Sequence, residues 1–214
     1  EEVATVLADE IRGKNVLITG TSLNGIGFET ARVVAKYANL VITTGHNAER
    51  LNLAEGAIKN DILTANIRPL ILDLSSLSAP LRLPSNILIA IHRHPTQILI
   101  HNAAATIGQF KLIADKLETQ MATNHIGPFL LTKLLTPKIL AAHTEHYTPR
   151  VVFVSSVGHS MTAGIDFDTL ARPDATRYVP KDAYNQSKAA NVLSTIELSK
   201  RSKGKINGYS LHPG

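Results

Sequence analysis

Short apolar runs alternate with longer amphipathic segments along most of this chain. Six runs are of strand length and nearly continuous in Val, Ile and Leu, as in strands buried on both faces of a parallel sheet. Four segments between them repeat apolar residues at helical spacing. The predicted strands are Asn15–Thr19, Leu40–Thr44, Pro69–Asp73, Gln97–His101, Arg150–Ser155 and Asn207–Leu211, and the predicted helices are Gly27–Ala38, Ala48–Asn60, Lys116–Ala141 and Ala183–Lys203.

This alternation of strands and helices predicts a doubly wound parallel sheet with helices on both faces. A length of 214 residues suits one domain, so we expect residues 1–214 to form a single α/β domain of the Rossmann type with about six strands. Because crossovers between parallel strands are right-handed, the carboxyl ends of the strands lie at one edge of the sheet. Ligands bind at that edge in such sheets.

Composition narrows the class of protein. Apolar residues make up 44% of the chain and charged residues 18%, which supports a packed core and argues against a disordered chain. The absence of cysteine excludes disulfides, thiolate metal sites and cysteine nucleophiles, and it fits the cytoplasmic location that we predict. No apolar stretch approaches the roughly 18 residues that a membrane span needs, so no span is predicted.

The positive charge could indicate a nucleic-acid site and the histidine pairs a metal site, and neither is favoured. The net charge is +5, but the 22 Lys and Arg residues are scattered and aromatic residues make up only 5%. A solvated basic surface is therefore a better interpretation than a nucleic-acid site. His92 and His94, and His143 and His146, lie close in sequence without a third ligand nearby, so no metal site is predicted.

Three glycines, Gly20, Gly25 and Gly27, lie between the first predicted strand and the helix that follows it. A helix N-terminus carries unpaired N–H groups and partial positive charge, and glycine lets a pyrophosphate approach that backbone closely. We interpret residues 20–27 as a phosphate-binding turn, with an ordinary glycine-rich turn as the alternative. No Lys-Ser or Lys-Thr pair follows Gly27, which argues against a nucleoside-triphosphate P-loop.

The residues after the second predicted strand bear on the choice of dinucleotide. A carboxylate about 20 residues beyond the glycines favours NAD, because it binds the ribose 2′-hydroxyl. This chain has Gly45, His46 and Asn47 there, and no carboxylate before Glu49. His46 and Arg50 can instead face a 2′-phosphate. NADP is therefore the predicted cofactor, with NAD binding and plain surface residues as the alternatives.

A tyrosine and a lysine stand four residues apart in the segment AYNQSKAAN, residues 183–191. This spacing brings Tyr184 and Lys188 to one face of a helix. An ammonium group beside a phenol favours the phenolate and lowers the pKa of the tyrosine from about 10. Tyr184 could then act as an acid or base near neutral pH, while an incidental surface pair is the alternative.

Seven stretches in order resemble motifs of the short-chain dehydrogenase/reductase family, over nearly the whole chain. They are TGTSLNGIG, LDLSSL, HNAAA, TNHIGPFLLTKLL, VVFVSSVGH, YNQSK and SLHPG. The long spacing from Ser156 to Tyr184, the segment IDFDTL and the HSM that follows the serines resemble the branch of retinol dehydrogenases and WW-domain oxidoreductases. No WW domain is present in this sequence.

The resemblance implies an oxidoreductase that interconverts an alcohol and a carbonyl, with a lipophilic substrate. It implies that Tyr184 exchanges a proton with the substrate oxygen, and that Ser156 hydrogen-bonds that oxygen. Lys188 would lower the pKa of Tyr184 and hold the nicotinamide ribose, and Asn124 would order a water that links Lys188 to solvent. The implied cofactor contacts are Gly20, Ser22, Asn24, Gly25, Ile26, Gly27, His46, Asn47, Arg50, Asp73, Leu74, Asn102, Ala103, Ala104, Tyr184, Lys188, Pro213 and Gly214.

The chain also departs from the family's pattern. Four residues separate Gly20 from Gly25 where the family has three, so we expect a bulge through Asn24. His101 stands where asparagine is common, Ala104 replaces a glycine, and His46 stands where the branch often has arginine.

The sequence stops after Pro213 and Gly214, where family members continue with a substrate-covering segment and another strand. We therefore interpret it as a fragment, with a substrate pocket walled by Met161–Val179 and by later segments. The alternatives to an active oxidoreductase are a non-catalytic nucleotide-binding sensor or scaffold of the same fold, and an inactive fragment. A full-length form could be a homo-oligomer.

Overall fold

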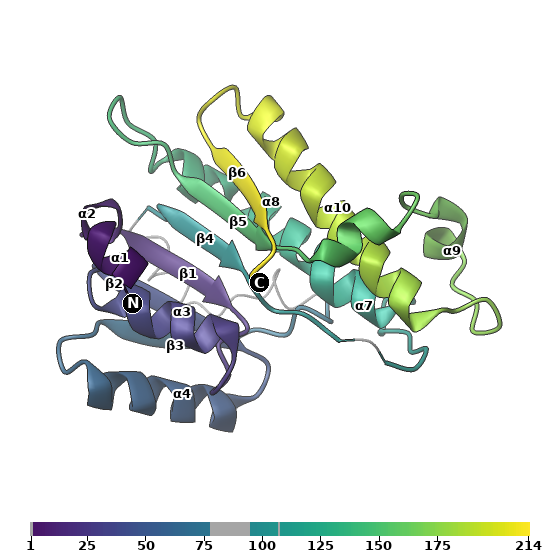
Figure 1. Ribbon diagram of the computed structural model, residues 1–214, viewed down its shortest axis with the longest axis horizontal. Coiled ribbons are helices and arrows are strands. Elements are labelled where there is room, and N and C mark those ends of the chain that lie inside the picture. The colour runs from purple at the N-terminus through teal and green to yellow at the C-terminus, as the bar shows by residue number, and fades with distance from the viewer. Residues whose placement is uncertain (1, 78–94, 107) are drawn as a thin grey trace.

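A six-stranded parallel sheet forms the centre of the molecule in the computed structural model, which describes residues 2–77, 95–106 and 108–214 (Figure 1). The strand order is β3-β2-β1-β4-β5-β6, and every neighbouring pair is parallel. This order confirms the predicted doubly wound α/β class. The strands are β1 (Asn15–Thr19), β2 (Leu40–Gly45), β3 (Ile67–Ile71), β4 (Ile98–His101), β5 (Arg150–Val154) and β6 (Asn207–Leu211).

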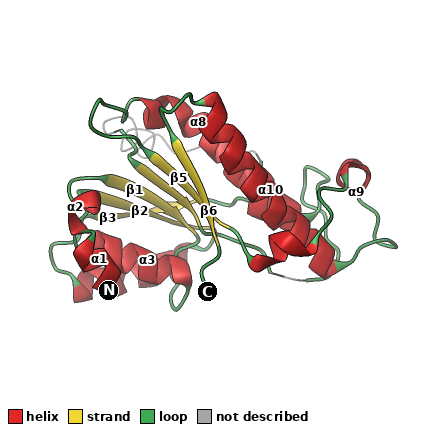
Figure 2. Cartoon of the chain, turned by 45° about the horizontal axis from the view of Figure 1, so that its top comes forward, coloured by secondary structure: helices red, strands yellow, loops and turns green. Residues whose placement is uncertain are grey.

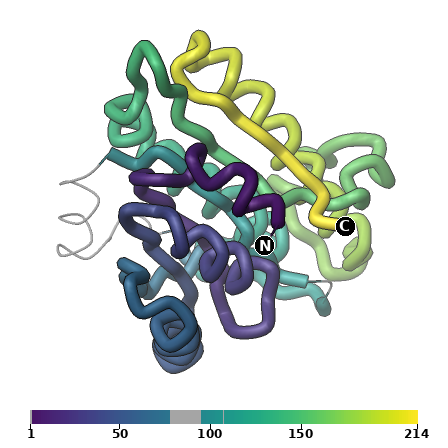
Figure 3. The backbone as a smooth tube through the Cα atoms, turned by 60° about the vertical axis from the view of Figure 1, so that its left-hand side comes forward, coloured from purple at the N-terminus to yellow at the C-terminus, as the bar shows by residue number. Residues whose placement is uncertain are grey.

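Helices cover both faces of this sheet (Figure 2). On one face, α3 (Ile26–Ala35) and α4 (Ala48–Asp61) pack against β1 and β2. On the other face, α8 (Gly127–Leu140) and the long α10 (Pro180–Arg201) cover the sheet. β3 and β6 form the two edges, and Figure 3 shows β6 far from α4 at the opposite side of the molecule.

The residues of β1 explain why the core has two parts. Every residue of this strand is buried, and successive side chains point to opposite faces of a sheet. Val16 and Ile18 join the cluster beneath α3 and α4, and Leu17 joins the cluster beneath α8. The continuous apolar run therefore supplies both cores at once, as expected for a central parallel strand.

Several short elements complete the fold, and the apolar pattern of the sequence did not predict them as separate elements. Two short helices, α1 (Glu2–Val6) and α2 (Ala8–Ile11), precede β1. The 3-10 turn η2 (Val157–Met161) and the helix α9 (Phe167–Ala171) lie between β5 and α10. α7 (Thr119–Met121) and the π-helical turn η1 (Ala122–Ile126) lead directly into α8.

Several predicted ends differ from the observed ones by one to three residues, and two of these differences have an identifiable cause. The third strand ends at Ile71, because Asp73 turns the chain: its Oδ1 accepts hydrogen bonds from the N–H and the hydroxyl of Ser75. The helix predicted over Lys116–Ala141 starts only at Thr119, where the Glu118 carboxylate caps it by accepting from the N–H groups of Gln120 and Met121. Of the histidines considered as metal ligands, His92 and His94 lie outside the described residues.

Candidate active site

The glycine turn between β1 and α3 lies at the point where the strand order reverses, since β1 pairs with β2 on one side and with β4 on the other. Gly20 has a φ of +72°, and a Cβ on it would lie 2.6 Å from the Cα of Ala103. A Cβ on Gly27 would collide with the side-chain nitrogen of Asn102 and the carbonyl oxygen of Gly20. These two glycines are thus required by the packing of the turn against the end of β4.

Gly25 differs from the other two glycines. It is the N-cap of α3, its Cβ would lie 3.3 Å from the carbonyl oxygen of Ser22, and no side chain caps this helix. The first N–H groups of α3 are therefore available to an anion, as the phosphate interpretation requires. Asn24 has a φ of +61°, so the extra residue of this turn adopts the left-handed conformation.

Asn102 and Ala103, which directly follow β4, are hydrogen-bonded to the end of β1 and to the glycine turn. The Oγ1 of Thr19 accepts from the main-chain N–H groups of both residues at 3.1 Å. The Nδ2 of Asn102 donates to the carbonyl oxygens of Thr19 at 3.1 Å and Gly20 at 2.8 Å. Asn102 was expected to contact a cofactor, and that contact stays a prediction; both of its side-chain donors fasten β4 to the turn.

The residues expected around the adenosine fall into two groups. Asn47 caps α4, because its Oδ1 accepts from the N–H of Arg50 at 2.9 Å. Leu74 is buried in the core, and Asp73 forms the turn after β3. The side chains of His46 and Arg50 are exposed and make no hydrogen bond or ion pair to other described residues, so they are available to a ligand.

Ser156 lies just beyond the end of β5. Its Oγ accepts from the N–H of Gly158 at 3.1 Å and so caps the turn η2, which leaves the hydroxyl proton free for another acceptor. A Cβ on Gly158 would collide with the Oδ1 of Asn185, so η2 packs tightly on α10. This packing brings the end of β5 against the helix that carries Tyr184.

Tyr184 and Lys188 lie one turn apart on α10, as the spacing predicts. The Nζ of Lys188 lies 5.5 Å from the centre of the Tyr184 ring and donates to the carbonyl oxygen of Val154 at 2.8 Å. Lys188 is only 2% exposed, and this burial lowers its pKa from 10.5 to about 8. The Tyr184 hydroxyl makes no hydrogen bond to the residues that the structure describes.

Asn124 lies in the π-helical turn η1 and is 2% exposed. Its Oδ1 accepts from the N–H of Ala105 at 2.6 Å, and its Nδ2 donates to the carbonyl oxygen of Ala105 at 3.1 Å and to the Oγ of Ser187 at 3.0 Å. The side chain therefore joins the segment after β4 to α10, next to Lys188.

Three residues of this network, Ser155, Ser187 and Asn191, were missed in the sequence. Ser155 donates to the carbonyl oxygen of Lys188 at 2.9 Å and joins β5 to α10. Ser187 and Asn191 stand three and seven residues after Tyr184 and are buried. For Ser187 and Asn191 the available sequence signal was a set of polar residues at helical spacing around Tyr184 and Lys188. In the structure these polar residues of α10 are buried.

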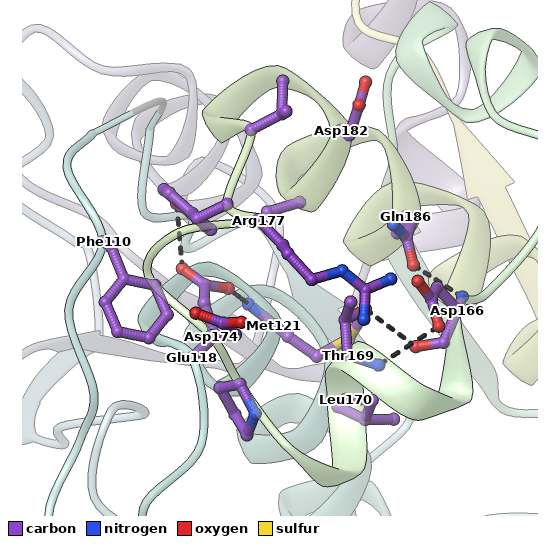
Figure 4. A pocket seen from close by; sticks show the side chains of 14 residues that line it. Phe110, Glu118, Met121, Asp166, Thr169, Leu170, Asp174, Arg177, Asp182 and Gln186 are labelled. Carbon is purple, nitrogen blue, oxygen red and sulfur yellow. Dashed lines mark hydrogen bonds between the residues drawn. The ribbon is translucent and has the colours of Figure 1, made fainter.

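Part of the segment expected to wall the substrate pocket lines a cavity beside the start of α10. A cavity of about 170 Å³ lies between α9, the start of α10 and the residues around Glu118 (Figure 4). Its lining includes Asp166, Leu170, Arg177 and Tyr178, but none of Ser156, Tyr184 and Lys188. The role of Met161–Val179 as a wall of the substrate pocket stays a prediction.

Within the described ranges 2–77, 95–106 and 108–214, no group of three or more potential ligands is arranged to hold a metal, and His143 and His146 join no such group. In the same ranges, no helix combines the length and apolarity that crossing a membrane requires.

The carboxyl-terminal pair expected near the cofactor, Pro213 and Gly214, follows β6 and is exposed. Ser22, in the turn after β1, and Ala104, in the turn after β4, are both exposed. Ile26 is the first residue of α3. All of these lie beyond strand ends or at a helix start, at the same edge of the sheet.

A family model described as short chain dehydrogenase matches residues 14–166. This chain belongs to the short-chain dehydrogenase family. The matched residues contain β1 to β5, the glycine turn, Asn124 and Ser156.

Curated relatives support the expected branch. The chain is 39% identical over 204 residues to short-chain dehydrogenase TIC 32 A, chloroplastic, from Brassica napus, covering 92% of this chain and 62% of that protein. It is 35% identical to human retinol dehydrogenase 13, with 95% and 59% covered. It is also 35% identical to the WW domain-containing oxidoreductase of Gallus gallus, with 96% and 49% covered. The chain thus spans about half to three-fifths of the length of these relatives.

Solved structures confirm the fold. A metagenomic short-chain oxidoreductase in complex with NADP has a TM-score of 0.72 and 21% identity, with 95% of this chain and 83% of that chain covered. The NADH-dependent reductase A1-R′ complexed with NAD has a TM-score of 0.74 and 22% identity, with 97% and 80% covered. At these identities the likeness establishes the Rossmann-like architecture, and the choice between the two cofactors stays open.

Proposed function

We propose that this chain is an NADP-dependent oxidoreductase that interconverts an alcohol and a ketone or aldehyde, with Tyr184 as the acid and base. The observation that carries the proposal is that Lys188 lies one turn from Tyr184 on α10, against the η2 turn that Ser156 caps. The η2 turn packs on α10, and the Lys188 ammonium lies 5.5 Å from the Tyr184 ring. Family membership supports an oxidoreductase, and NAD(P) supplies or accepts the hydride when bound.

The residues have distinct parts in this proposal. In the reducing direction, negative charge develops on the carbonyl oxygen, and the hydroxyl groups of Tyr184 and Ser156 stabilise it. Tyr184 donates its proton to that oxygen and becomes a phenolate, and the reverse reaction returns the proton. Lys188 stabilises the phenolate by its positive charge. Asn124 holds the segment after β4 against α10. In this proposal it also orders a water that links Lys188 to solvent.

The cofactor preference rests on a different part of the molecule. The uncapped start of α3 at Gly25 fits a pyrophosphate. Beyond β2, where a 2′-phosphate would lie, His46 and Arg50 present exposed side chains that have no partner among the described residues. A lipophilic substrate follows only from the relatives named retinol dehydrogenase, and the cytoplasmic location and a homo-oligomeric full-length form stay predictions.

Cofactor binding is the first test. The purified chain is titrated with NADPH and with NADH while nicotinamide fluorescence is recorded, for the wild type and for Arg50→Ala. We expect NADPH to bind more tightly, and Arg50→Ala to reduce that preference about tenfold, because one charge-assisted contact is removed. Tighter binding of NADH would reverse the cofactor assignment, and binding of neither nucleotide by the folded chain would contradict the proposal.

Tyr184→Phe tests the chemistry. With a panel of aliphatic and aromatic aldehydes and ketones, we expect kcat/KM to fall by about 10²–10⁴-fold. The free energy of unfolding should change by less than about 0.5 kcal/mol, because the hydroxyl has no partner among the described residues. Unchanged turnover would show that Tyr184 is not the acid, and would favour the scaffold alternative if the wild type were equally slow.

Tyr178→Phe is the matched control. The Tyr178 hydroxyl donates to Glu118 at 3.1 Å and accepts from Gln120 at 2.7 Å. Its removal should cost about 1 kcal/mol of stability and leave kcat/KM within about twofold. The two variants therefore separate loss of chemistry from loss of stability.

A further inference from the structure

One main-chain oxygen in the segment that carries Asn124 lacks its usual helical donor. In an α-helix the carbonyl of residue i accepts from the N–H of residue i+4. For Asn124 that residue is Pro128, and proline has no N–H. The segment forms the π-helical turn η1 here, before α8 begins at Gly127. A carbonyl inside the protein that loses its donor requires another one.

Asn191 supplies that donor from α10. Its Nδ2 donates to the carbonyl oxygen of Asn124 at 3.1 Å, and its Oδ1 is 3.0 Å from the Nδ1 of His125. Since Oδ1 can only accept, His125 carries a proton on Nδ1. Asn191 is 2% exposed, so both polar groups of a buried side chain bind consecutive residues of η1. An unpaired buried amide would be costly, and here both the nitrogen and the oxygen of the side chain have a partner.

Ser187 attaches the same segment one turn earlier on α10. Its Oγ accepts from the Nδ2 of Asn124 at 3.0 Å and donates to the main-chain carbonyl of Tyr184 at 2.7 Å. The side chain and the main chain of Asn124 are thus both attached to the helix of Tyr184 and Lys188. Of these two hydrogen-bonded contacts with Asn124, only the one from Asn191 takes the place of a helical hydrogen bond, the one that Pro128 prevents.

We propose that Asn191 is a positioning residue, which holds the main chain of Asn124 at a set distance from Tyr184 and Lys188 in place of the helical bond lost at Pro128. The catalytic consequence rests on the proposed function. The mechanical part does not, because it concerns only contacts within this chain.

Asn191→Leu removes the donor and keeps a similar side-chain volume. We expect faster hydrogen exchange of amides in residues 122–127, measured by mass spectrometry. We also expect kcat to fall about tenfold with the KM for NADPH changed less than about twofold, because geometry at the reacting atoms is altered and nucleotide binding is not. Thr195→Val is the matched control, since Thr195 is equally buried on α10 and its Oγ1 donates only to Val192 within the helix.

Restoring the missing helical donor provides the decisive comparison. The double variant Pro128→Ala with Asn191→Leu regains an N–H at residue 128, so exchange and kcat should both return at least halfway to wild type. If Asn191→Leu precipitates, Asn191→Ala removes the same donor with less side chain. Unchanged exchange in Asn191→Leu, an effect equal to that of Thr195→Val, or no recovery in the double variant would each overturn the proposal.

Failure of the proposed function is recognised separately. If the wild type and Tyr184→Phe turn over substrate equally slowly, the catalytic assignment fails, and the exchange measurements still decide whether Asn191 holds η1. If Tyr184→Phe is inactive while Asn191→Leu keeps full kcat, the enzyme stands and the positioning role is overturned.

Discussion

The nucleotide half and the catalytic half of the candidate site use different chemical groups. Beside β1 to β3, the nucleotide half uses glycines and main-chain N–H groups, and its buried polar side chains near the site are small threonines such as Thr19, Thr21 and Thr44. Beside β5, the catalytic half buries Asn124 and Lys188 together with the residues that bind them. The glycine turn of the first half leaves no room for added side chains, and the second half depends on buried ones.

This difference reflects what each half is required to do. A phosphate needs close backbone and a helix N-terminus, so any Cβ that fills the turn is harmful. The catalytic half holds the charge of Lys188 out of water, and burial of a charge costs stability. We therefore expect the two halves to respond to substitution in opposite ways.

The largest expected effect is that of Lys188→Met. Activity should fall about 10³-fold, because no cation remains to stabilise the phenolate of Tyr184. Stability at pH 7 should rise by about 2 kcal/mol: the difference between a pKa of 10.5 unfolded and about 8 folded corresponds to about 3 kcal/mol, less the lost hydrogen bond to Val154. Urea unfolding and steady-state kinetics measure both.

The same variant has a signature in pH dependence. Below pH 8 the lysine is charged in both states and its burial penalty is fully present. Between pH 8 and 10.5 the folded protein releases the proton first, so the contribution of Lys188 to stability rises with pH in the wild type. Lys188→Met should lack this rise. A variant that is less stable at pH 7 and keeps the rise would show that burial of the charge is not costly here.

Gly27→Ala tests the opposite behaviour of the nucleotide half. The new Cβ collides with Asn102 and with the Gly20 carbonyl, so we expect a loss of about 2–3 kcal/mol in stability and of most NADPH binding. Gly56→Ala is the control within α4, where a Cβ meets nothing within 4 Å, and it should stabilise by about 0.5–1 kcal/mol. Thermal unfolding ranks the two, and equal behaviour would remove the packing argument for Gly27.

The smallest expected effect is at Asn24, the extra residue of the phosphate turn. Its φ of +61° favours asparagine and glycine over residues with other side chains. Asn24→Gly should change stability by less than about 0.5 kcal/mol, and Asn24→Ala should cost about 1 kcal/mol. Denaturant unfolding of the pair checks this, and a neutral alanine variant would mean that the left-handed conformation is not required.

Elements with a strong local pattern could be predicted from the sequence. β1 and β6 have their predicted bounds, and α4 extends only one residue beyond its predicted end. Their apolar periodicity is the dominant local signal. The end of β3 and the start of α7 could not be predicted from periodicity, because the side chains of Asp73 and Glu118 set them by hydrogen bonds to nearby N–H groups.

Sequence alone determined the family, the glycine turn and the one-turn spacing of Tyr184 and Lys188, since each depends on residues close together in the chain. Tertiary structure alone decided that Asn102 fastens β4 to the turn and that Asn191 replaces the donor missing at Pro128. These bonds join residues 82 and 67 positions apart. A hydrogen bond across such a separation leaves no periodic trace in a sequence, because folding alone brings its donor and acceptor together.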